Sequence, residues 1–316
     1  MAGLKSQILA LCDGVQRDLK LSGLPTDGSA SDGTEYESLK QMWTAKLGLG
    51  SKVNACVGRG SRSALQAPVI TCLDRDAILY VLHTQYMYSN TYHGLSGQSL
   101  ASWYEKAYDY WEEEGNCRAD EDGVLGGFGH ISPIDVAGSA AFLDELRELR
   151  PQMGSGRAAD CGAGIGRVAK HLLLGRYDFV DIVEQSPRLI GAAPKYIGRE
   201  RDRVECICVG MQDFAPEPDS YDLIWIQWVV GHLHDIDLLK FINRCRVALK
   251  TGGVIVLKDN TSNEGAFVVD CEDSSLTRSL GYFRSLFNQG GIKVVHQKLQ
   301  PGFPDSIFPV HIFALV

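Results

Sequence analysis

Residues 158–167 read Ala-Ala-Asp-Cys-Gly-Ala-Gly-Ile-Gly-Arg, and they give the clearest indication of how this chain folds. A short apolar strand pattern, Ala158–Cys161, leads into glycines at alternate positions, and a helical pattern follows from Gly166 to Leu174. Glycine lets the backbone approach a ligand closely, and the start of a helix leaves amide groups free to bind an anion or a carboxylate. This strand–loop–helix unit therefore predicts a ligand site.

Strand and helix patterns alternate along the chain around this loop. Strand patterns lie at Ala158–Cys161, Phe179–Val183, Val204–Val209, Asp222–Gln227, Val254–Leu257, Lys293–Gln297 and His311–Leu315, and helical patterns at Gly166–Leu174, Arg188–Tyr196, Asp237–Leu249 and Ser275–Phe287. Strands separated by helices indicate a mainly parallel sheet with helices on both faces. No helical pattern separates the last two strands, which indicates an antiparallel finish. We expect a seven-stranded, Rossmann-like α/β fold with its ligand beyond the carboxyl ends of the early strands.

The spacing of the glycines distinguishes two classes of cofactor. Dinucleotide enzymes favour Gly-x-Gly-x-x-Gly with the pyrophosphate at the helix terminus, whereas this loop is Gly-x-Gly-x-Gly with Asp160 in front of it. Aspartate beside the loop repels a pyrophosphate but suits the ammonium and sulfonium groups of S-adenosylmethionine. Glu184, at the end of the next predicted strand, is placed to accept hydrogen bonds from a ribose. The loop therefore favours an S-adenosylmethionine-dependent methyltransferase fold over a nicotinamide dehydrogenase.

The composition argues against several other classes of protein. The chain has 316 residues with 31 basic and 39 acidic side chains, a formal charge of −8, whereas direct nucleic-acid binding depends on clustered Lys and Arg. No apolar run approaches the roughly 18–20 residues of a membrane span, and no secretory signal is recognisable. Nine cysteines, none of them in a Cys-x-x-Cys pair, indicate reduced thiols rather than disulfides or a zinc site. We expect a cytoplasmic and/or nuclear protein without a bound metal ion.

The first hundred residues differ from the rest of the chain. Helical apolar spacing occurs at Leu4–Leu21, Glu35–Leu47 and Asp74–Tyr88, and Pro25–Thr34 has the composition of a loop. No motif that carries chemistry lies in this part. We expect residues 1–100 to form a partly helical N-terminal extension of unknown role, and residues 101–316 to form the methyltransferase domain.

Several longer segments carry a family resemblance. They are Tyr110-Trp111, residues 122–135 (Asp-Gly-Val-Leu-Gly-Gly-Phe-Gly-His-Ile-Ser-Pro-Ile-Asp), the glycine loop 160–167, residues 216–222, residues 225–233 (Trp-Ile-Gln-Trp-Val-Val-Gly-His-Leu) and Lys258-Asp-Asn260. In these segments the chain resembles the α-N-terminal protein methyltransferases, from about Tyr108 to its end. The glycine loop is generic to the class, whereas the Leu-Gly-Gly-aromatic-Gly-His-Ile-Ser and Ile-Gln-Trp-Val-x-Gly-His segments are far more specific.

The resemblance implies that the enzyme methylates the α-amino group of protein N-termini that read X-Pro-Lys or X-Pro-Arg after methionine removal. It assigns S-adenosylmethionine to Gly162, Gly164, Arg167, Glu184, Gln185, Ser186, Met211, Gln212 and Gln227. It assigns the substrate to Trp111, Leu125, Gly126, Ile131, Trp228, His232, Asn260, Asp270 and Asp273. Glu184 stands where the family commonly has Asp, and Met211 stands where it has Leu.

Methyl transfer from a sulfonium needs an uncharged amine, and this requirement points to catalytic residues. The pKa of an α-amine is about 7.7–8.0, against about 10.4 for lysine, so an N-terminal amine needs only modest help in losing its proton. Asp273 and His232 are our candidates for accepting that proton, with Asn260 fixing the amine through its side-chain carbonyl. The chain is one residue longer than the family pattern between Gly265 and Ser274, so Asp270 and Glu272 compete with Asp273, which we favour because it precedes the Ser-Ser pair.

Other functions fit parts of the same sequence. A small-molecule methyltransferase that acts on an amine or a carboxylate has the same glycine loop, but it does not bind an X-Pro-Lys peptide saturably. A noncatalytic adaptor could use the N-terminal extension as its working part, and it does not bind S-adenosylmethionine. The intact glycine loop argues against the adaptor.

Overall fold

The structure is a computed structural model, and it describes residues 27–30, 35–36, 97–263 and 266–316. The chain divides into two compact units, one of residues 1–22 and 39–103, the other of residues 23–38 and 104–316. Most described residues belong to the second unit, which holds the predicted methyltransferase domain. None of the described helices is long and apolar enough to cross a membrane.

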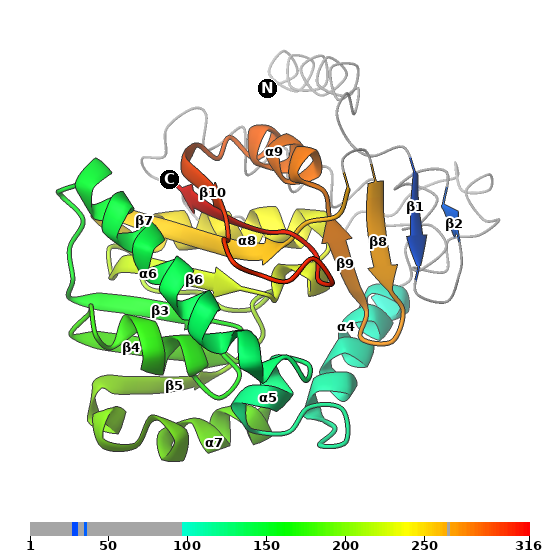
Figure 1. Cartoon of the computed structure of the whole chain (residues 1–316), viewed down its shortest axis with the longest axis horizontal. Coiled ribbons are helices and arrows are strands. Elements are labelled where there is room, and N and C mark those ends of the chain that lie inside the picture. The colour runs from blue at the N-terminus through cyan, green and yellow to red at the C-terminus, as the bar shows by residue number, and fades with distance from the viewer. Residues whose placement is uncertain (1–26, 31–34, 37–96, 264–265) are drawn as a thin grey trace, which may run out of the picture. The chain divides into compact units, whose positions relative to one another are not determined.

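A seven-stranded sheet forms the centre of the second unit (Figure 1). Its strands are β3 (Arg157–Cys161), β4 (Phe179–Glu184), β5 (Val204–Cys208), β6 (Tyr221–Gln227), β7 (Leu249–Asn260), β10 (Val294–Leu299) and β11 (Val310–Leu315). The order is β10-β11-β7-β6-β3-β4-β5. Strands β3 to β7 pair in parallel, and β11 is antiparallel to both β7 and β10. The predicted fold, including its antiparallel finish, is confirmed.

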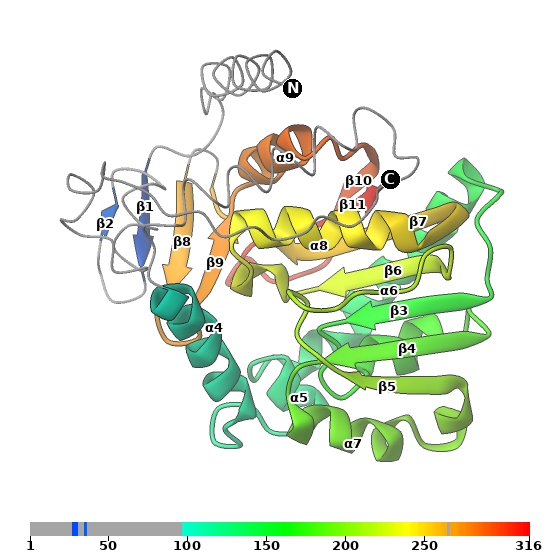
Figure 2. The same ribbon diagram turned by 180° about the vertical axis from the view of Figure 1, so that it is seen from behind.

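Helices cover both faces of this sheet, because its central strands β3, β4 and β6 are buried on both sides. The described helices are α4 (Gly97–Glu112), α5 (Glu121–Val124), α6 (Ser132–Leu149), α7 (Pro187–Ile197), α8 (Asp235–Ala248) and α9 (Leu280–Gln289), with short helical turns at η1 (Gly129–Ile131), η2 (Ala169–Leu173), η3 (Gly198–Arg203) and η4 (Val230–His232). Helix α6 lies over one face in Figure 1, and α8 and α9 lie over the opposite face in Figure 2. Alternate residues of β11 point to opposite faces of the sheet: Ile312 packs in the cluster that includes α6, and Phe313 packs against Phe283 of α9.

A second sheet corrects three sequence predictions, one of which is the helix predicted at Glu35–Leu47, because Glu35 and Tyr36 form a strand instead. Its order is β2 (Glu35–Tyr36), β1 (Asp27–Ala30), β8 (Ala266–Asp270) and β9 (Ser275–Arg278). The predicted helix 275–287 begins only at Leu280, because Ser279 caps it by accepting a hydrogen bond from the amide of Tyr282 and the residues before it form β9. The predicted loop 25–34 contains β1, which pairs in parallel with β8.

The β1 and β2 strands also bear on the division of the chain. Residues 23–38 group with the methyltransferase unit, although they lie in the predicted extension of residues 1–100. The prediction of helical segments at Leu4–Leu21 and Asp74–Tyr88 falls outside the described residues. The extension and its boundary near residue 100 stay a prediction. Strands β1 and β2 do not fit it, because they group with the methyltransferase unit.

Candidate active site

The glycine loop lies between β3 and the following helix, and its backbone explains its sequence. Gly162, Gly164 and Gly166 have φ values of 70°, 56° and 82°, in the left-handed region that favours glycine. A Cβ atom on Gly162 would lie 2.5 Å from the side chain of Val229. The loop therefore needs glycine both for its conformation and for the close approach of its neighbour.

Two buried carboxylates hold this loop. Asp160 accepts a hydrogen bond from the amide of Ala169, at 2.8 Å. Glu184 accepts one from the amide of Gly164 through Oε2 and one from the amide of Ser186 through Oε1, both at 2.9 Å. Burial raises the pKa of Asp160 to about 7, and burial also raises the pKa of Glu184. Burial disfavours these negative charges, so a cationic ligand beside them would bind the ionised forms better than the protonated ones.

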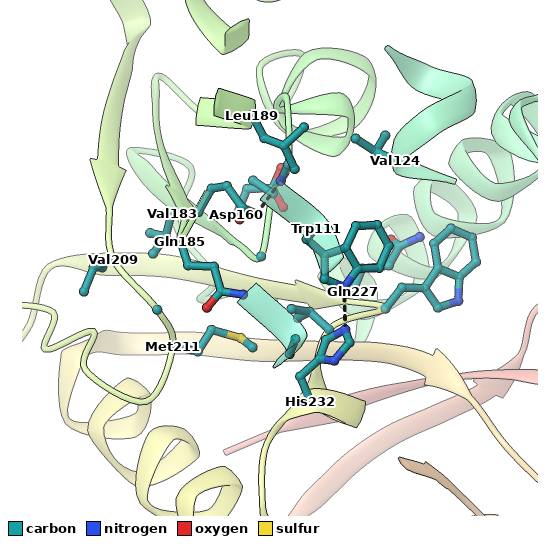
Figure 3. A pocket seen from close by; sticks show the side chains of 18 of the residues that line it. Trp111, Val124, Asp160, Val183, Gln185, Leu189, Val209, Met211, Gln227 and His232 are labelled. Atoms are coloured by element: carbon teal, nitrogen blue, oxygen red, sulfur yellow. Dashed lines mark hydrogen bonds between the residues drawn. The ribbon is translucent and has the colours of Figure 1, made fainter. Parts of the chain in front are cut away.

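A pocket opens over the loop at the carboxyl ends of β3, β4 and β6 (Figure 3). The predicted cofactor residues that line it are Gly162, Gly164, Arg167, Glu184, Gln185, Met211, Gln212 and Gln227. Ser186 is not among the lining residues, but its amide binds Glu184 and its hydroxyl caps α7. Val124, Leu189 and Val209 add an apolar wall that the sequence analysis did not include, because single apolar residues in separate segments form no motif. The pocket combines an apolar wall, buried acids and glycine backbone, which suits an adenosine-containing cation.

Arg167 and Gln227 share a buried carboxylate partner, Asp135, which is not among the residues predicted for the site. Both donate to the carboxylate of Asp135, Arg167 through Nη2 at 2.8 Å and Gln227 through Nε2 at 2.9 Å. Lys258 is the third partner, with its Nζ 2.5 Å from Oδ1 of Asp135. All four side chains are buried, and burial lowers the pKa of Lys258 to about 8. The sequence held one indication of this buried carboxylate. Lys258 ends the apolar run of β7, and a buried cation requires a carboxylate partner.

A second pocket of about 660 Å³ adjoins the first. Eight of the nine predicted substrate residues line it: Trp111, Leu125, Gly126, Ile131, Trp228, His232, Asn260 and Asp273. Asp270 is outside this lining and accepts a hydrogen bond from the amide of Glu272 in the β8–β9 turn. Among the three competing acids, Asp273 alone belongs to the described lining. Residues 275–277 and 305–309 also belong to the wall, and they could not be predicted because they carry no recognisable pattern.

Trp228 directly follows β6, and Asn260 is the last residue of the neighbouring strand β7. Trp228 has a φ of 53°, and its amide donates to the carbonyl of Lys258 at 3.0 Å. Its indole Nε1 donates to Oδ1 of Asn260 at 3.1 Å. The ring stacks on Phe303, with centroids 6.2 Å apart, and lies 5.7 Å from Cζ of Arg167. The indole is therefore held from several sides in the wall of the second pocket, which we call the peptide groove or simply the groove.

Both ring nitrogens of His232 have partners that fix their roles. Nε2 lies 3.0 Å from Nε1 of Trp111, which can only donate (Figure 3). Nδ1 lies 3.1 Å from the carbonyl oxygen of Ser274, which can only accept. His232 is consequently the Nδ1–H tautomer, and the lone pair of Nε2 is occupied by the indole of Trp111.

Asp273 and Asp259 place carboxyl groups in the lining of the second pocket. Burial raises the pKa of Asp273, and it raises the pKa of Asp259 to about 6. Oδ1 of Asp273 and Oδ2 of Asp259 are buried without a hydrogen-bond partner among the described residues. Asp259 also accepts a hydrogen bond from the amide of Asn260, at 2.7 Å. Buried polar atoms usually have partners, so these two oxygens mark a place where the groove can accept a donor.

The chain shows clear similarity to known proteins. Residues 99–316 match a family described as AdoMet dependent proline di-methyltransferase. The human N-terminal Xaa-Pro-Lys N-methyltransferase 1 is 45% identical over 214 residues, which is 67% of this chain and 94% of that protein. The Xenopus laevis N-terminal Xaa-Pro-Lys N-methyltransferase 1-B is 44% identical over 214 residues, with the same coverage of both chains.

A solved structure agrees with these sequence matches. It is a SAM-dependent methyltransferase of Leishmania major, 32% identical, with a TM-score of 0.69 over 93% of this chain and 97% of that chain. The family match spans more than half of the chain and includes the glycine loop and both pockets. This protein therefore belongs to the family of S-adenosylmethionine-dependent proline di-methyltransferases.

Proposed function

We propose that this protein transfers methyl groups from S-adenosylmethionine to the α-amino group of protein N-termini that read X-Pro-Lys or X-Pro-Arg after methionine removal. One observation carries the proposal. Trp111, Val124, Leu125, Trp228 and His232 line both pockets, so a cofactor in the first and a peptide end in the second would meet across one shared wall. Holding two reactants in line in this way supplies much of the acceleration of a transfer reaction.

The first pocket fits the cofactor. S-adenosylmethionine, when bound, supplies an electrophilic methyl group on a sulfonium. Asp160 and Glu184 would stabilise its positive charges and ribose, and the glycine loop would lie against its amino-acid part. Gln185, Met211 and Gln212 would surround the nucleoside, and Ser186 would contribute by holding the carboxylate of Glu184 through its amide. Arg167 and Gln227 would act chiefly by shaping the pocket, because their polar groups already bind Asp135.

The second pocket suits an amine that must lose a proton. About a tenth of α-amines are neutral at pH 7, but fewer than about one in a thousand lysine amines. Asp273 would accept the proton, since its raised pKa makes it a better base than an ordinary carboxylate and Oδ1 is without a partner among the described residues. Asn260 would hold the amine through its side-chain carbonyl, which can accept a second hydrogen bond beside that of Trp228. His232 would serve only after Trp111 leaves its Nε2.

The groove also suits the rest of the proposed substrate. Leu125, Gly126 and Ile131 give an apolar surface for the first residues of the peptide. Asp270, at the end of β8, and Glu272, in the same turn as Asp273, would attract a Lys or Arg at the third position. Trp111 and Trp228 would accommodate the methylated, cationic amine by cation–π attraction, worth about 0.5–2 kcal/mol.

Mass spectrometry of a peptide that begins Ala-Pro-Lys, after incubation with the protein and S-adenosylmethionine, tests the proposal. We expect added methyl groups confined to the N-terminal amine. The same peptide with an acetylated N-terminus is the control and should stay unmodified. Methylation of an internal lysine, or the absence of saturable binding of the peptide, would contradict the proposal and favour a small-molecule substrate.

The location of the protein is part of the proposal as well. Its proposed substrates are protein N-termini exposed after methionine removal, and its cysteines suit a reducing environment. We therefore place it in the cytoplasm and/or the nucleus. Imaging of the full chain fused at its C-terminus to a fluorescent protein checks this assignment, and secretion would contradict it.

A further inference from the structure

The C-terminal end of α4 is capped by a side chain from another helix. The last carbonyl groups of a helix have no partner within the helix. In α4 the carbonyl of Trp111 accepts a hydrogen bond from Nη2 of Arg188 at 2.8 Å, and the carbonyl of Glu112 accepts one from Nε at 2.7 Å. Nη2 also donates to the carbonyl of Cys117, at 2.7 Å, in the loop that follows. One half-buried guanidinium thus satisfies three carbonyl groups.

Arg188 comes from the part of the chain that borders the cofactor pocket. It is the second residue of α7, directly after the segment of Glu184, Gln185 and Ser186. A further contact joins the same two elements, because the hydroxyl of Ser186 donates to the carboxylate of Glu112. The end of α4 is therefore attached to the segment that we assign to the cofactor.

Trp111 lies in the last turn of α4 and depends on this attachment. Its indole lines both pockets and donates to Nε2 of His232 at 3.0 Å. It also packs against the small cluster of Cys117, Ile165 and Leu189. If the last turn of α4 moves, the indole moves with it, and the shared wall of the two pockets changes shape.

The geometry points to a positioning role for Arg188: its guanidinium fixes the last turn of α4, so that Trp111 stands in the wall between the cofactor pocket and the peptide groove. This inference rests on the proposed function and adds a residue to it. It also ties the peptide groove mechanically to the cofactor segment. Arginine suits the role because its planar fork carries five donors, whereas lysine offers a single compact charge.

The test compares Arg188→Met with a matched variant, Arg203→Met. Arg203 also binds three carbonyl groups, those of Leu174, Tyr177 and Asp178, but it is not among the residues that line either pocket. We expect Arg188→Met to lower kcat/KM for the Ala-Pro-Lys peptide by about tenfold or more, because a displacement of about 1 Å can cost that much. The affinity for S-adenosylmethionine should fall much less than kcat/KM, because Trp111 is one of many residues that line the cofactor pocket. Arg188→Lys should recover part of the loss. Arg203→Met should keep the wild-type kcat/KM.

A double-mutant cycle separates positioning from a general loss of stability. If Arg188 acts through Trp111, then Arg188→Met should have little further effect on kcat/KM once Trp111→Ala has removed the indole. Fully additive losses, or an Arg188→Met variant with normal kinetics, would overturn the inference. Thermal melts of each variant establish that it folds.

A spectroscopic measurement keeps the inference testable whatever the enzyme methylates. The indole N–H resonance of Trp111, assigned by its absence in Trp111→Phe, should exchange slowly with solvent in the wild type and in Arg203→Met. It should shift and exchange faster in Arg188→Met. An unchanged resonance in Arg188→Met overturns the inference, whereas an unmodified peptide with wild-type enzyme overturns only the proposed function.

Discussion

The indole of Trp228, directly after β6, donates a hydrogen bond to the side-chain carbonyl of Asn260, the last residue of the neighbouring strand β7. Trp228 reaches this position with a φ of 53°, a conformation that costs a residue other than glycine about 1–2 kcal/mol. The amide of Trp228 compensates by bonding to the carbonyl of Lys258 at 3.0 Å. The strained residue thus places an indole and an amide side by side in the groove, where we propose that the amine is held.

Replacing Asn260 by alanine should impair the reaction of the peptide rather than cofactor binding. The variant loses the carbonyl that we assign to the amine and leaves the indole N–H of Trp228 without its partner. We expect kcat/KM for the peptide to fall by about a hundredfold, since the nucleophile is no longer held in line. Steady-state kinetics and calorimetry with S-adenosylmethionine measure both effects. Asn243→Ala, on α8, is the control and should stay near wild type.

Asp273→Asn should lose at least about a hundredfold in kcat, a typical contribution of a positioned general base. The amide keeps the shape of the carboxyl group but cannot take the proton of the α-ammonium group. Cofactor affinity should stay unchanged, because Asp273 lines only the second pocket. Turnover with the peptide and calorimetry with the cofactor give the two values.

Asp270→Asn and Glu272→Gln are the matched controls for this variant. Both change a carboxylate in the same turn, and neither residue is among those that line the groove. They should raise the KM of a peptide with Lys at its third position and affect kcat little. If Asp273→Asn keeps normal turnover while one of the controls loses it, the role of the base passes to that residue.

The affinity for S-adenosylmethionine should increase with pH. Burial raises the pKa of Asp160 to about 7, so Asp160 is largely protonated at pH 6 and largely ionised at pH 8. A cation binds the ionised form better, so the dissociation constant should fall by up to about tenfold over this interval. Burial also raises the pKa of Glu184, which acts in the same direction. Calorimetry at a series of pH values measures the dependence.

Asp160→Asn isolates the contribution of this carboxylate. The amide can still accept the hydrogen bond from Ala169, so the loop should keep its conformation. We expect weaker binding of the cofactor at pH 8 and a smaller change of affinity with pH. A pH dependence identical to that of the wild type would show that Asp160 does not interact with the cation.

Much of the fold could be predicted from the sequence, because apolar runs and glycines are local signals. Residues 254–257 read as a strand since four apolar residues follow two glycines, and Val254 to Leu257 are buried in β7. The β8–β9 pair escaped prediction because its strands are short and its second sheet needs β1, which lies far upstream. Pairing between distant segments leaves no periodic pattern in either of them.

In the site, too, local motifs could be predicted and contacts between distant segments could not. The glycine loop, Glu184 and the segment around Trp228 could be located because each is a continuous motif. The bond between Trp111 and His232 could not, because it joins helix α4 to the short turn η4, which lies far along the chain. It changes the assignment of roles, since it occupies the nitrogen with which His232 would accept a proton. The role of Asp135 could not be predicted for the same reason: Arg167, Gln227 and Lys258 approach it from three other elements.

Asp135→Asn should destabilise the protein more than Lys258→Met. The carboxylate of Asp135 is paired with two buried cations, Arg167 at 2.8 Å and Lys258 at 2.5 Å. Its removal leaves both without a carboxylate, and breaking a buried pair of this kind costs about 3–5 kcal/mol. Lys258→Met instead leaves one cation with one carboxylate, so its cost should be smaller. Urea unfolding of the two variants gives the free energies to be compared.

Measuring the loss of stability in Asp135→Asn at different pH values shows whether the loss is electrostatic. Burial lowers the pKa of Lys258 to about 8, so the folded protein begins to release this proton below the pH at which the unfolded chain does. The unfolded state then binds more protons above pH 8, and stability gains from this group as the pH rises. Asp135→Asn should therefore be most destabilising at pH 7 and less so at pH 9. A surface variant, Asp144→Ala, removes the exposed partner of Arg176 and should change stability little at either pH. A loss in Asp135→Asn that is equal at pH 7 and pH 9 would mean that packing, rather than uncompensated charge, accounts for it.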